Sequence, residues 1–205
     1  MNRAEQFCQT IKRMSQNFAA ILPPEYQQVE YIATTSGCYI VTSVTNTTPI
    51  EFETEAKSYN NTGGYVFGTT TNPPRYFLQL FTGAGKTAIG YNNYTTGGTV
   101  TDNVYYKLSG IIHNGEQKLY IDGVQDISAA MTGTLSQAYI RLFGVPEHPL
   151  RGEMRYFRIT SNGTPLFNGI PCYRKSDNRA GMYDTINNQF IDSPTLSNFT
   201  VGQDV

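Results

Sequence analysis

The chain of 205 residues carries 15 basic and 16 acidic residues, so its formal net charge is −1. It is long enough for one domain with a sizeable core, and it offers no broad basic surface to hold a nucleic-acid backbone. Its three cysteines are too few for a disulfide framework, and its two histidines leave little material for a metal site or a catalytic triad. We therefore expect no cofactor, no metal ion and no nucleic-acid partner.

Residues 3–21 have the periodicity of an amphipathic helix. Apolar residues recur at spacings of three and four, charged and amide residues take the other side, and two prolines after Leu22 end the pattern. This predicts an N-terminal segment, residues 1–21, for attachment or oligomerisation. Its apolar stripe either packs on the chain's own β-domain or docks on another subunit, and the second case predicts a homo-oligomer. The interface residues of the stripe are Phe7, Ile11, Met14 and Phe18.

Long apolar runs are missing from the sequence. The N-terminal residues lack the apolar core of a signal peptide, and no stretch is apolar over the roughly 18 residues that a membrane-spanning helix needs. We therefore expect synthesis in the cytoplasm and no membrane partner.

From Tyr26 onward the apolar residues alternate with a period of two. Short runs of β-branched and aromatic residues are separated by turn residues, and 15 Tyr, 11 Phe and 19 Gly fit such a chain. No helical pattern long enough for a parallel crossover lies between the runs, so the strands should form antiparallel sheets packed face to face. The predicted strands are residues 29–32, 38–42, 50–56, 64–69, 75–81, 87–91, 104–112, 118–121, 139–145, 154–160 and 164–170.

Residues that tolerate positive φ mark the hairpin turns. Asn114-Gly115, Asp122-Gly123 and Ser161-Asn162-Gly163 each lie between two predicted strands. The segment GAGKT at 83–87 ends like a phosphate-binding loop, but Leu80 stands where that loop needs a glycine. We therefore interpret GAGKT as another hairpin turn.

The stretch IEFETEAK at 50–57 places Glu51, Glu53 and Glu55 at alternate positions. On a strand they share one face, about 6.5 to 7 Å from one to the next, and paired carboxylates near this distance can hydrolyse glycosides. A row on an outer, solvated face cannot flank a sugar bond from both sides. We therefore interpret the row as a polar face, with a glycoside hydrolase site or a cation site as weaker alternatives.

Two predicted loops have the chemistry for binding sugars, SYNNTGGY at 58–65 and GYNNYTTGG at 90–98. Aromatic faces can stack on sugar rings and amides can bind hydroxyl groups, usually on loops held by a rigid scaffold. Asn and Gly also dominate loops for purely conformational reasons. The candidate ligand-binding residues are Tyr59, Asn60, Asn61, Tyr91, Asn92, Asn93 and Tyr94.

Three motifs carry a resemblance to a known domain. LPPEYQQVEYIATTSG begins at Leu22, KLYIDGV covers 118–124, and IPCYRKSDNRAGMYD covers 170–184. These motifs closely resemble a recurrent domain of gut-bacterial phages and their relatives, over about residues 22–200. That domain is similar to the concanavalin A-like and laminin-G-like jelly rolls.

The resemblance implies a fold and a biological setting. The fold is an all-β, antiparallel two-sheet jelly-roll sandwich, concanavalin A-like, over residues 22–205 after the N-terminal helix. Hydrolases of this group use a Glu-x-Asp-x-x-Glu strand, whereas residues 51–55 are one residue shorter and lack the aspartate. The setting is a virion, as a tail, fibre or head-decoration protein assembled in the host bacterial cytoplasm.

We therefore expect a non-enzymatic phage virion module that binds host surface carbohydrate. Its partners would be other virion proteins, through the N-terminal helix, and host glycans. The alternative is a purely structural capsid or tail decoration subunit without a ligand. No residue is expected to be catalytic.

Overall fold

Wherever the computed structural model describes the chain, it contains strands joined by turns, bends and irregular segments and no helix, which confirms the all-β prediction. The predicted helix at 3–21, with Phe7, Ile11, Met14 and Phe18, lies outside the described residues. Among those residues, no helix is long and apolar enough to cross a membrane. The structure describes residues 22–45, 49–59, 63–69, 76–80, 84–91, 93–113, 115–131, 138–145, 148–195 and 197–205, with the backbone alone at 76, 91, 93, 94 and 113.

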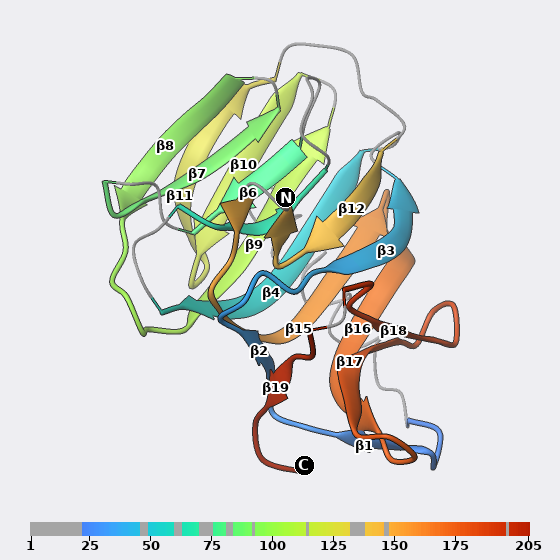
Figure 1. Cartoon of the computed structure of the whole chain (residues 1–205). Helices are drawn as coiled ribbons and strands as arrows, with labels where there is room; N and C mark the ends of the chain where they lie inside the picture. The colour runs from blue at the N-terminus through green and yellow to red at the C-terminus, as the bar shows by residue number, and fades with distance from the viewer. Residues whose placement is uncertain are drawn as a thin grey trace.

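The strands form two sheets that lie face to face (Figure 1). The large sheet has the strand order β11-β10-β9-β4-β15-β16-β17-β18, with β1 beside β16, β2 beside β15 and β19 beside β2. Its strands are β1 (Tyr26–Gln28), β2 (Ile32–Thr34), β4 (Ile50–Ser58), β9 (Tyr106–His113), β10 (Glu116–Ile121), β11 (Val124–Ala130), β15 (Gly152–Ser161), β16 (Thr164–Arg174), β17 (Arg179–Asp184), β18 (Gln189–Asp192) and β19 (Thr200–Val201).

The small sheet has the order β13-β14-β5-β6-β7-β8, and β12 joins β3 to β5. The described pairs of both sheets are antiparallel apart from one parallel bridge between β14 and β5. The predicted sandwich of antiparallel sheets is therefore confirmed. The strands of the small sheet are β3 (Ile40–Thr45), β5 (Tyr65–Gly68), β6 (Tyr76–Gln79), β7 (Lys86–Tyr91), β8 (Asn93–Thr99), β12 (Tyr139–Leu142), β13 (Gly144–Val145) and β14 (His148–Pro149).

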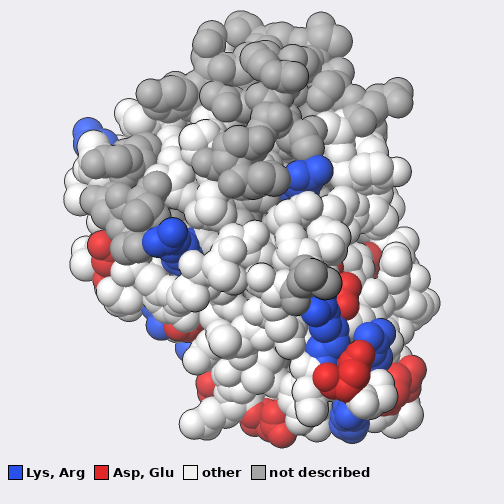
Figure 2. Space-filling model, in the orientation of Figure 1, with Lys and Arg blue, Asp and Glu red and all other residues white. Residues whose placement is uncertain are grey.

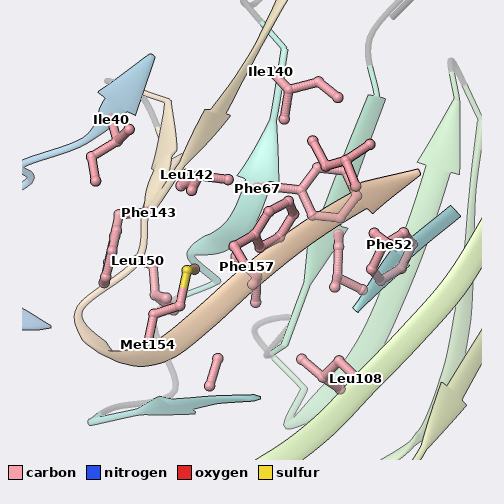
Figure 3. Close-up of a cluster of buried hydrophobic side chains, with 14 of the residues drawn as sticks. Ile40, Phe52, Phe67, Leu108, Ile140, Leu142, Phe143, Leu150, Met154 and Phe157 are labelled. Carbon is pink, nitrogen blue, oxygen red and sulfur yellow. The ribbon is translucent and has the colours of Figure 1, made fainter. Parts of the chain in front are cut away.

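The main core fills the space between the sheets. Buried and half-buried positions alternate along β4, so Ile50, Phe52 and Ala56 point into this space. Phe67 on β5 meets Phe52 edge to face, with 4.9 Å between ring centroids, and meets Phe157 on β15 at 5.4 Å. Figure 3 shows Phe67 and Phe157 side by side in the middle of the cluster. These aromatic contacts join the two sheets.

The predicted hairpin turns are confirmed where the structure describes them. Asp122 and Gly123 have φ angles of 50° and 83° between β10 and β11, and Asn162 and Gly163 have 49° and 77° between β15 and β16. Positive φ at both central residues is the geometry that suits a two-residue hairpin. Gly85, with a φ of 70°, lies in the turn before β7, as predicted for the GAGKT segment.

The segment 90–98 is a strand hairpin, so the prediction of a loop there is wrong. β7 runs to Tyr91 and β8 starts at Asn93, which leaves a single position between them. Gly90 is paired with Tyr94 in the register of the two strands. Tyrosine and threonine favour extended backbone, and pairing with a neighbouring strand outweighs the turn preference of Asn and Gly.

A second apolar layer lies on the outer face of the small sheet. Leu78 and Ile89 belong to the main core, and their neighbours along each strand point the other way. One of those neighbours, Phe77, stacks its ring on Tyr65 of β5 with 4.7 Å between centroids. This layer, which we call the outer cluster, consists of the buried residues Tyr65, Phe77, Ala88 and Val145.

The segment 170–192, which we call the closing motif, includes the hairpin of β17 and β18 around a buried carboxylate. Asp184 is fully buried and accepts hydrogen bonds from the backbone N–H groups of Asn168 and Ile186, each at 3.1 Å. The side-chain amide of Asn187 donates to the other carboxylate oxygen at 2.6 Å. These bonds tie the turn to β16, and the strands β17 and β18 flank it.

Candidate functional site

The glutamates of β4 lie on the outer face of the large sheet, opposite β15. Glu51 is opposite Thr160 in the register, and Glu53 is opposite Arg158. Thr160 Oγ1 donates to Glu51 Oε2 at 2.9 Å, and Arg158 Nη1 lies 3.7 Å from Glu53 Oε1. The Tyr156 hydroxyl also donates to Glu53 Oε1, at 2.9 Å. Both carboxylates are therefore engaged by β15.

Glu55 is paired through a β-bulge. The register shifts between Met154 and Tyr156, so Arg155 is the extra residue of β15. Its Nη1 lies 2.9 Å from Glu55 Oε1. The side chains of Glu53 and Glu55 are only 15% and 18% exposed. The prediction that the row is freely solvated is therefore wrong, because the neighbouring strand supplies a partner for each acid.

This arrangement does not suit hydrolysis. A glycosidase places two carboxyl groups on either side of the bond that it cleaves. The three glutamates instead remain in one row along one strand, each with a partner on β15. The chemistry of the row is that of a cross-strand ladder, which stabilises the pairing of β4 with β15.

A polar network lies where β4 ends. Its centre is Glu153 on β15, which is only 4% exposed. Lys57 Nζ lies 2.7 Å from Glu153 Oε1, and the Tyr59 hydroxyl donates to the same oxygen at 2.8 Å. The Tyr105 hydroxyl donates to Oε2. We call these four residues, Lys57, Tyr59, Tyr105 and Glu153, the rim cluster.

Cations cover the ring of Tyr105. Lys57 Nζ lies 4.8 Å from the ring centroid, and the guanidinium carbon of Arg155 lies 3.9 Å from it. A cation within about 6 Å of an aromatic centroid is attracted to the ring face. The Tyr105 ring is therefore already stacked within the protein.

The protonation states in the rim cluster support one another. Burial and the hydrogen bond to Glu153 raise the pKa of Tyr59 and that of Tyr105 well above the ordinary value. Burial alone would raise the pKa of Glu153, but hydrogen bonds from Lys57, Tyr105 and Tyr59 outweigh it and hold that pKa below its ordinary value. At neutral pH the carboxylate is ionised and both hydroxyls are donors.

The rim cluster is thus a satisfied network. Both carboxylate oxygens of Glu153 accept bonds from within the chain, and a ligand would have to displace them. Within the ranges that the structure covers, no group of three or more His, Cys, Asp or Glu could hold a metal ion. The described network therefore fits a structural anchor better than a binding or reacting centre.

The two predicted ligand segments lie at opposite ends of the sandwich. The backbone N–H of Asn103 donates to the carbonyl of Ser58 at 2.8 Å, which places the segment that follows β8 beside the residue before Tyr59. The turn between β7 and β8 is at the other end of β8, a strand of 7 residues that spans about 20 Å. The structure therefore does not bring Tyr59 together with Tyr91 and Tyr94.

The predicted ligand residues differ in what the structure describes of them. The hydroxyl of Tyr59 is bound to Glu153. Asn60, Asn61 and Asn92 lie outside the described residues, and only the strand positions of Tyr91, Asn93 and Tyr94 are described. Their role in binding a ligand stays a prediction.

The cations of the closing motif are engaged within the chain. Arg174 donates two hydrogen bonds to the carboxylate of Asp177, at 3.1 and 2.7 Å, and Arg179 Nε donates to Asp192 at 2.9 Å. Figure 2 shows acidic and basic side chains close together at the lower right of this face. This pairing favours a surface loop over an anion site.

Lys57, Tyr105 and Glu153 were not predicted as site residues. Lys57 continues the alternation of the glutamates, and that pattern was a signal for its place on the outer face. No local pattern joins it to Glu153, because the two residues come from different strands that pair only in the folded sheet.

The sequence of the chain matches the model of a known protein family. Residues 32–162 match the laminin-G-type model described as the concanavalin A-like lectin/glucanases superfamily. The chain belongs to this family. The matched region runs from β2 to the end of β15, so the closing motif of β16 to β18 follows it. Among curated protein sequences, none matches the chain.

Several solved structures share the fold at low sequence identity. A candidate carbohydrate-binding protein from Bacteroides ovatus has a TM-score of 0.57 and 11% identity over 87% of this chain and 62% of its own. This chain therefore spans less than two thirds of that protein. The CBM40 module of the Ruminococcus gnavus IT-sialidase, solved with α2,3-sialyllactose, has a TM-score of 0.52 and 13% identity over 68% of this chain and 92% of its own. A heptameric pentraxin from Limulus polyphemus has a TM-score of 0.50 and 11% identity over 71% of this chain and 80% of its own.

Proposed function

We propose that the protein is a non-catalytic carbohydrate-binding module of a phage virion. The observation that argues against hydrolysis is the pairing of Glu51, Glu53 and Glu55 with β15. The sialyllactose held by a module of the same fold supports carbohydrate as the ligand class. The resemblance of the motifs at 22–37 and 170–184 to a phage domain supports the virion setting.

The primary ligand site in this proposal is the β7–β8 turn, with Tyr91, Asn92, Asn93 and Tyr94. The turn stands at one end of the small sheet, on a paired hairpin that provides a rigid base. The other predicted segment is less suitable, because the Tyr59 hydroxyl is already committed to Glu153. Its remaining contribution would come from the ring of Tyr59 and from Asn60 and Asn61.

Substitution at the turn tests the binding role. On a glycan array, Tyr91→Ala and Tyr94→Ala should each weaken binding by about tenfold or more, because loss of a stacked ring removes roughly 1.4 kcal/mol. Tyr139, which is 54% exposed on β12, provides the matched control, and Tyr139→Ala should bind like the wild type. If the intact protein binds no glycan, the carbohydrate-binding proposal is abandoned.

Attachment to the particle is assigned to residues 1–21. The apolar stripe of Phe7, Ile11, Met14 and Phe18 would dock on another virion protein or on a second copy of this chain. The competing possibility is packing on the chain's own β-domain, for which the outer cluster on the small sheet is an apolar face. The two possibilities predict different behaviour when the segment is removed.

Removal of the segment tests the attachment role. In sedimentation velocity the full chain should form an oligomer, while a chain that begins at Leu22 should be a monomer of unchanged thermal stability. Ile11→Asp in the full chain should also give monomers, because a charge in the stripe opposes apolar packing. If both chains are monomers and the shortened chain unfolds more easily, the result would support packing on the chain's own domain instead.

The second candidate is a purely structural decoration subunit. The rim cluster favours this candidate, because both carboxylate oxygens of Glu153 already accept hydrogen bonds from within the chain and are not available to a ligand. This candidate predicts that the intact oligomer binds no glycan on the array.

A further inference from the structure

A cavity lies beyond the family-matched region, between the closing motif and the C-terminal strand β19. Its volume is about 380 Å³, within the range of about 300–1,000 Å³ that is typical of ligand pockets. The lining residues are Tyr173, Asn178, Ala180, Phe199, Thr200 and Val201. We call it the Tyr173 pocket.

The pocket combines an apolar floor with a polar edge. Ala180 and Phe199 are 1% and 3% exposed, and Val201 adds an apolar side chain that is 39% exposed. Tyr173 and Thr200 contribute hydroxyl groups. A sugar ring has the same division, with C–H groups on its faces and hydroxyl groups around its edge.

The polar groups of the pocket make only long hydrogen bonds, or none, to the described chain. The Tyr173 hydroxyl donates to Asp204 Oδ2 at 3.5 Å, and Thr200 Oγ1 donates to the carbonyl of Ala33 at 3.4 Å, both near the outer limit for a hydrogen bond. Within the described chain, the side-chain amide of Asn178 makes no hydrogen bond. Redirecting these groups to a ligand would cost little, in contrast to the tightly bonded rim cluster.

The charges around the pocket disfavour an anionic ligand. Arg174 and Arg179 adjoin Tyr173 and Ala180 along their strands, and their guanidinium groups are paired with Asp177 and Asp192. The carboxylate of Asp204 stands beside the Tyr173 hydroxyl. The charge next to the pocket is therefore negative, which repels a carboxylate and attracts hydroxyl donors.

We propose that the Tyr173 pocket binds one neutral monosaccharide unit. One face of the sugar ring would pack on Val201 and on the small exposed part of Phe199, while its hydroxyl groups bond to Asp204, Asn178 and Thr200. This site is separate from the β7–β8 turn. It rests on the proposed function only in taking carbohydrate as the ligand class.

Backbone amide NMR titration of the full chain tests this proposal. The probes are methyl α-glucoside, methyl α-galactoside, methyl α-mannoside, N-acetylglucosamine and, as the anionic comparison, N-acetylneuraminic acid. At least one neutral sugar should give saturable shifts at Tyr173, Thr200 and Val201. Thr200→Trp, which fills the exposed mouth, should weaken this binding tenfold or more, and Asp204→Asn should weaken it severalfold.

Control variants separate this proposal from the proposed function. Val124→Trp, at a side chain that is 72% exposed on β11, should leave the titration unchanged. Shifts confined to the β7–β8 turn would keep the carbohydrate-binding function and overturn the pocket. Equal binding by wild type and a folded Thr200→Trp variant, or tighter binding of N-acetylneuraminic acid at these residues, would also overturn it. If no sugar binds at any residue, both proposals fail.

Discussion

Glu153→Ala should lower the free energy of unfolding by about 3 kcal/mol, at the lower end for breaking a buried ion pair. The substitution leaves the ammonium of Lys57 and the hydroxyls of Tyr59 and Tyr105 without their common acceptor. Lys57 keeps some contact with water at 18% exposure, which limits the loss. Urea unfolding followed by circular dichroism measures the change.

The matched control is Glu55→Ala on the same face. Glu55 is paired with Arg155, whose side chain is 40% exposed and can return to water. Loss of such a partly exposed pair should cost only about 0.2–1 kcal/mol. Equal losses for Glu55→Ala and Glu153→Ala would show that the rim cluster is no more than a surface ion pair.

The effect of Glu153 should depend on pH. Its pKa in the folded protein lies below the ordinary value, so the ionised form stabilises the fold fully above the unfolded pKa, and this contribution is lost as the pH falls through the folded pKa. The stability gap between wild type and Glu153→Gln should therefore be constant near neutral pH and shrink below about pH 4. A gap that widens on acidification would contradict the assignment.

Phe157→Ala should lower the free energy of unfolding by about 3–5 kcal/mol, because a large cavity would open in a core that cannot close fully. Phe157 is fully buried and meets Phe67 of the facing sheet and Phe167 of the next strand edge to face. The same unfolding measurement applies. Phe157→Leu keeps most of the volume and should cost clearly less, so equal losses for both variants would argue against a packing role.

Local patterns of the sequence determined much of the fold. The alternation in IEFETEAK is enough to place Ile50, Phe52 and Ala56 on one face, because side chains of a strand alternate. Asp122-Gly123 and Asn162-Gly163 specify their turns, because these residues tolerate positive φ. Such features depend on a few neighbouring residues, so they can be read without the tertiary structure.

Other segments have local preferences that tertiary contacts override. The glutamates of β4 were expected to be solvated, and pairing with β15 instead covers them. The segment 90–98 has the composition of a loop, yet strand pairing extends it. Neither outcome can be derived from the segment alone. Each depends on pairing with another strand, and the sequence of the segment does not identify that strand.

The candidate sites show the same division most clearly. The sequence by itself determined which residue types were present for binding: tyrosines, asparagines and paired acids. Only the tertiary structure placed Lys57, Tyr105 and Glu153 in one network and separated Tyr59 from Tyr91 by the length of the sandwich. It also formed the Tyr173 pocket from β16, β17 and β19. The physical reason is that antiparallel sheets join strands distant in sequence, and the choice of neighbour comes from packing of the whole core.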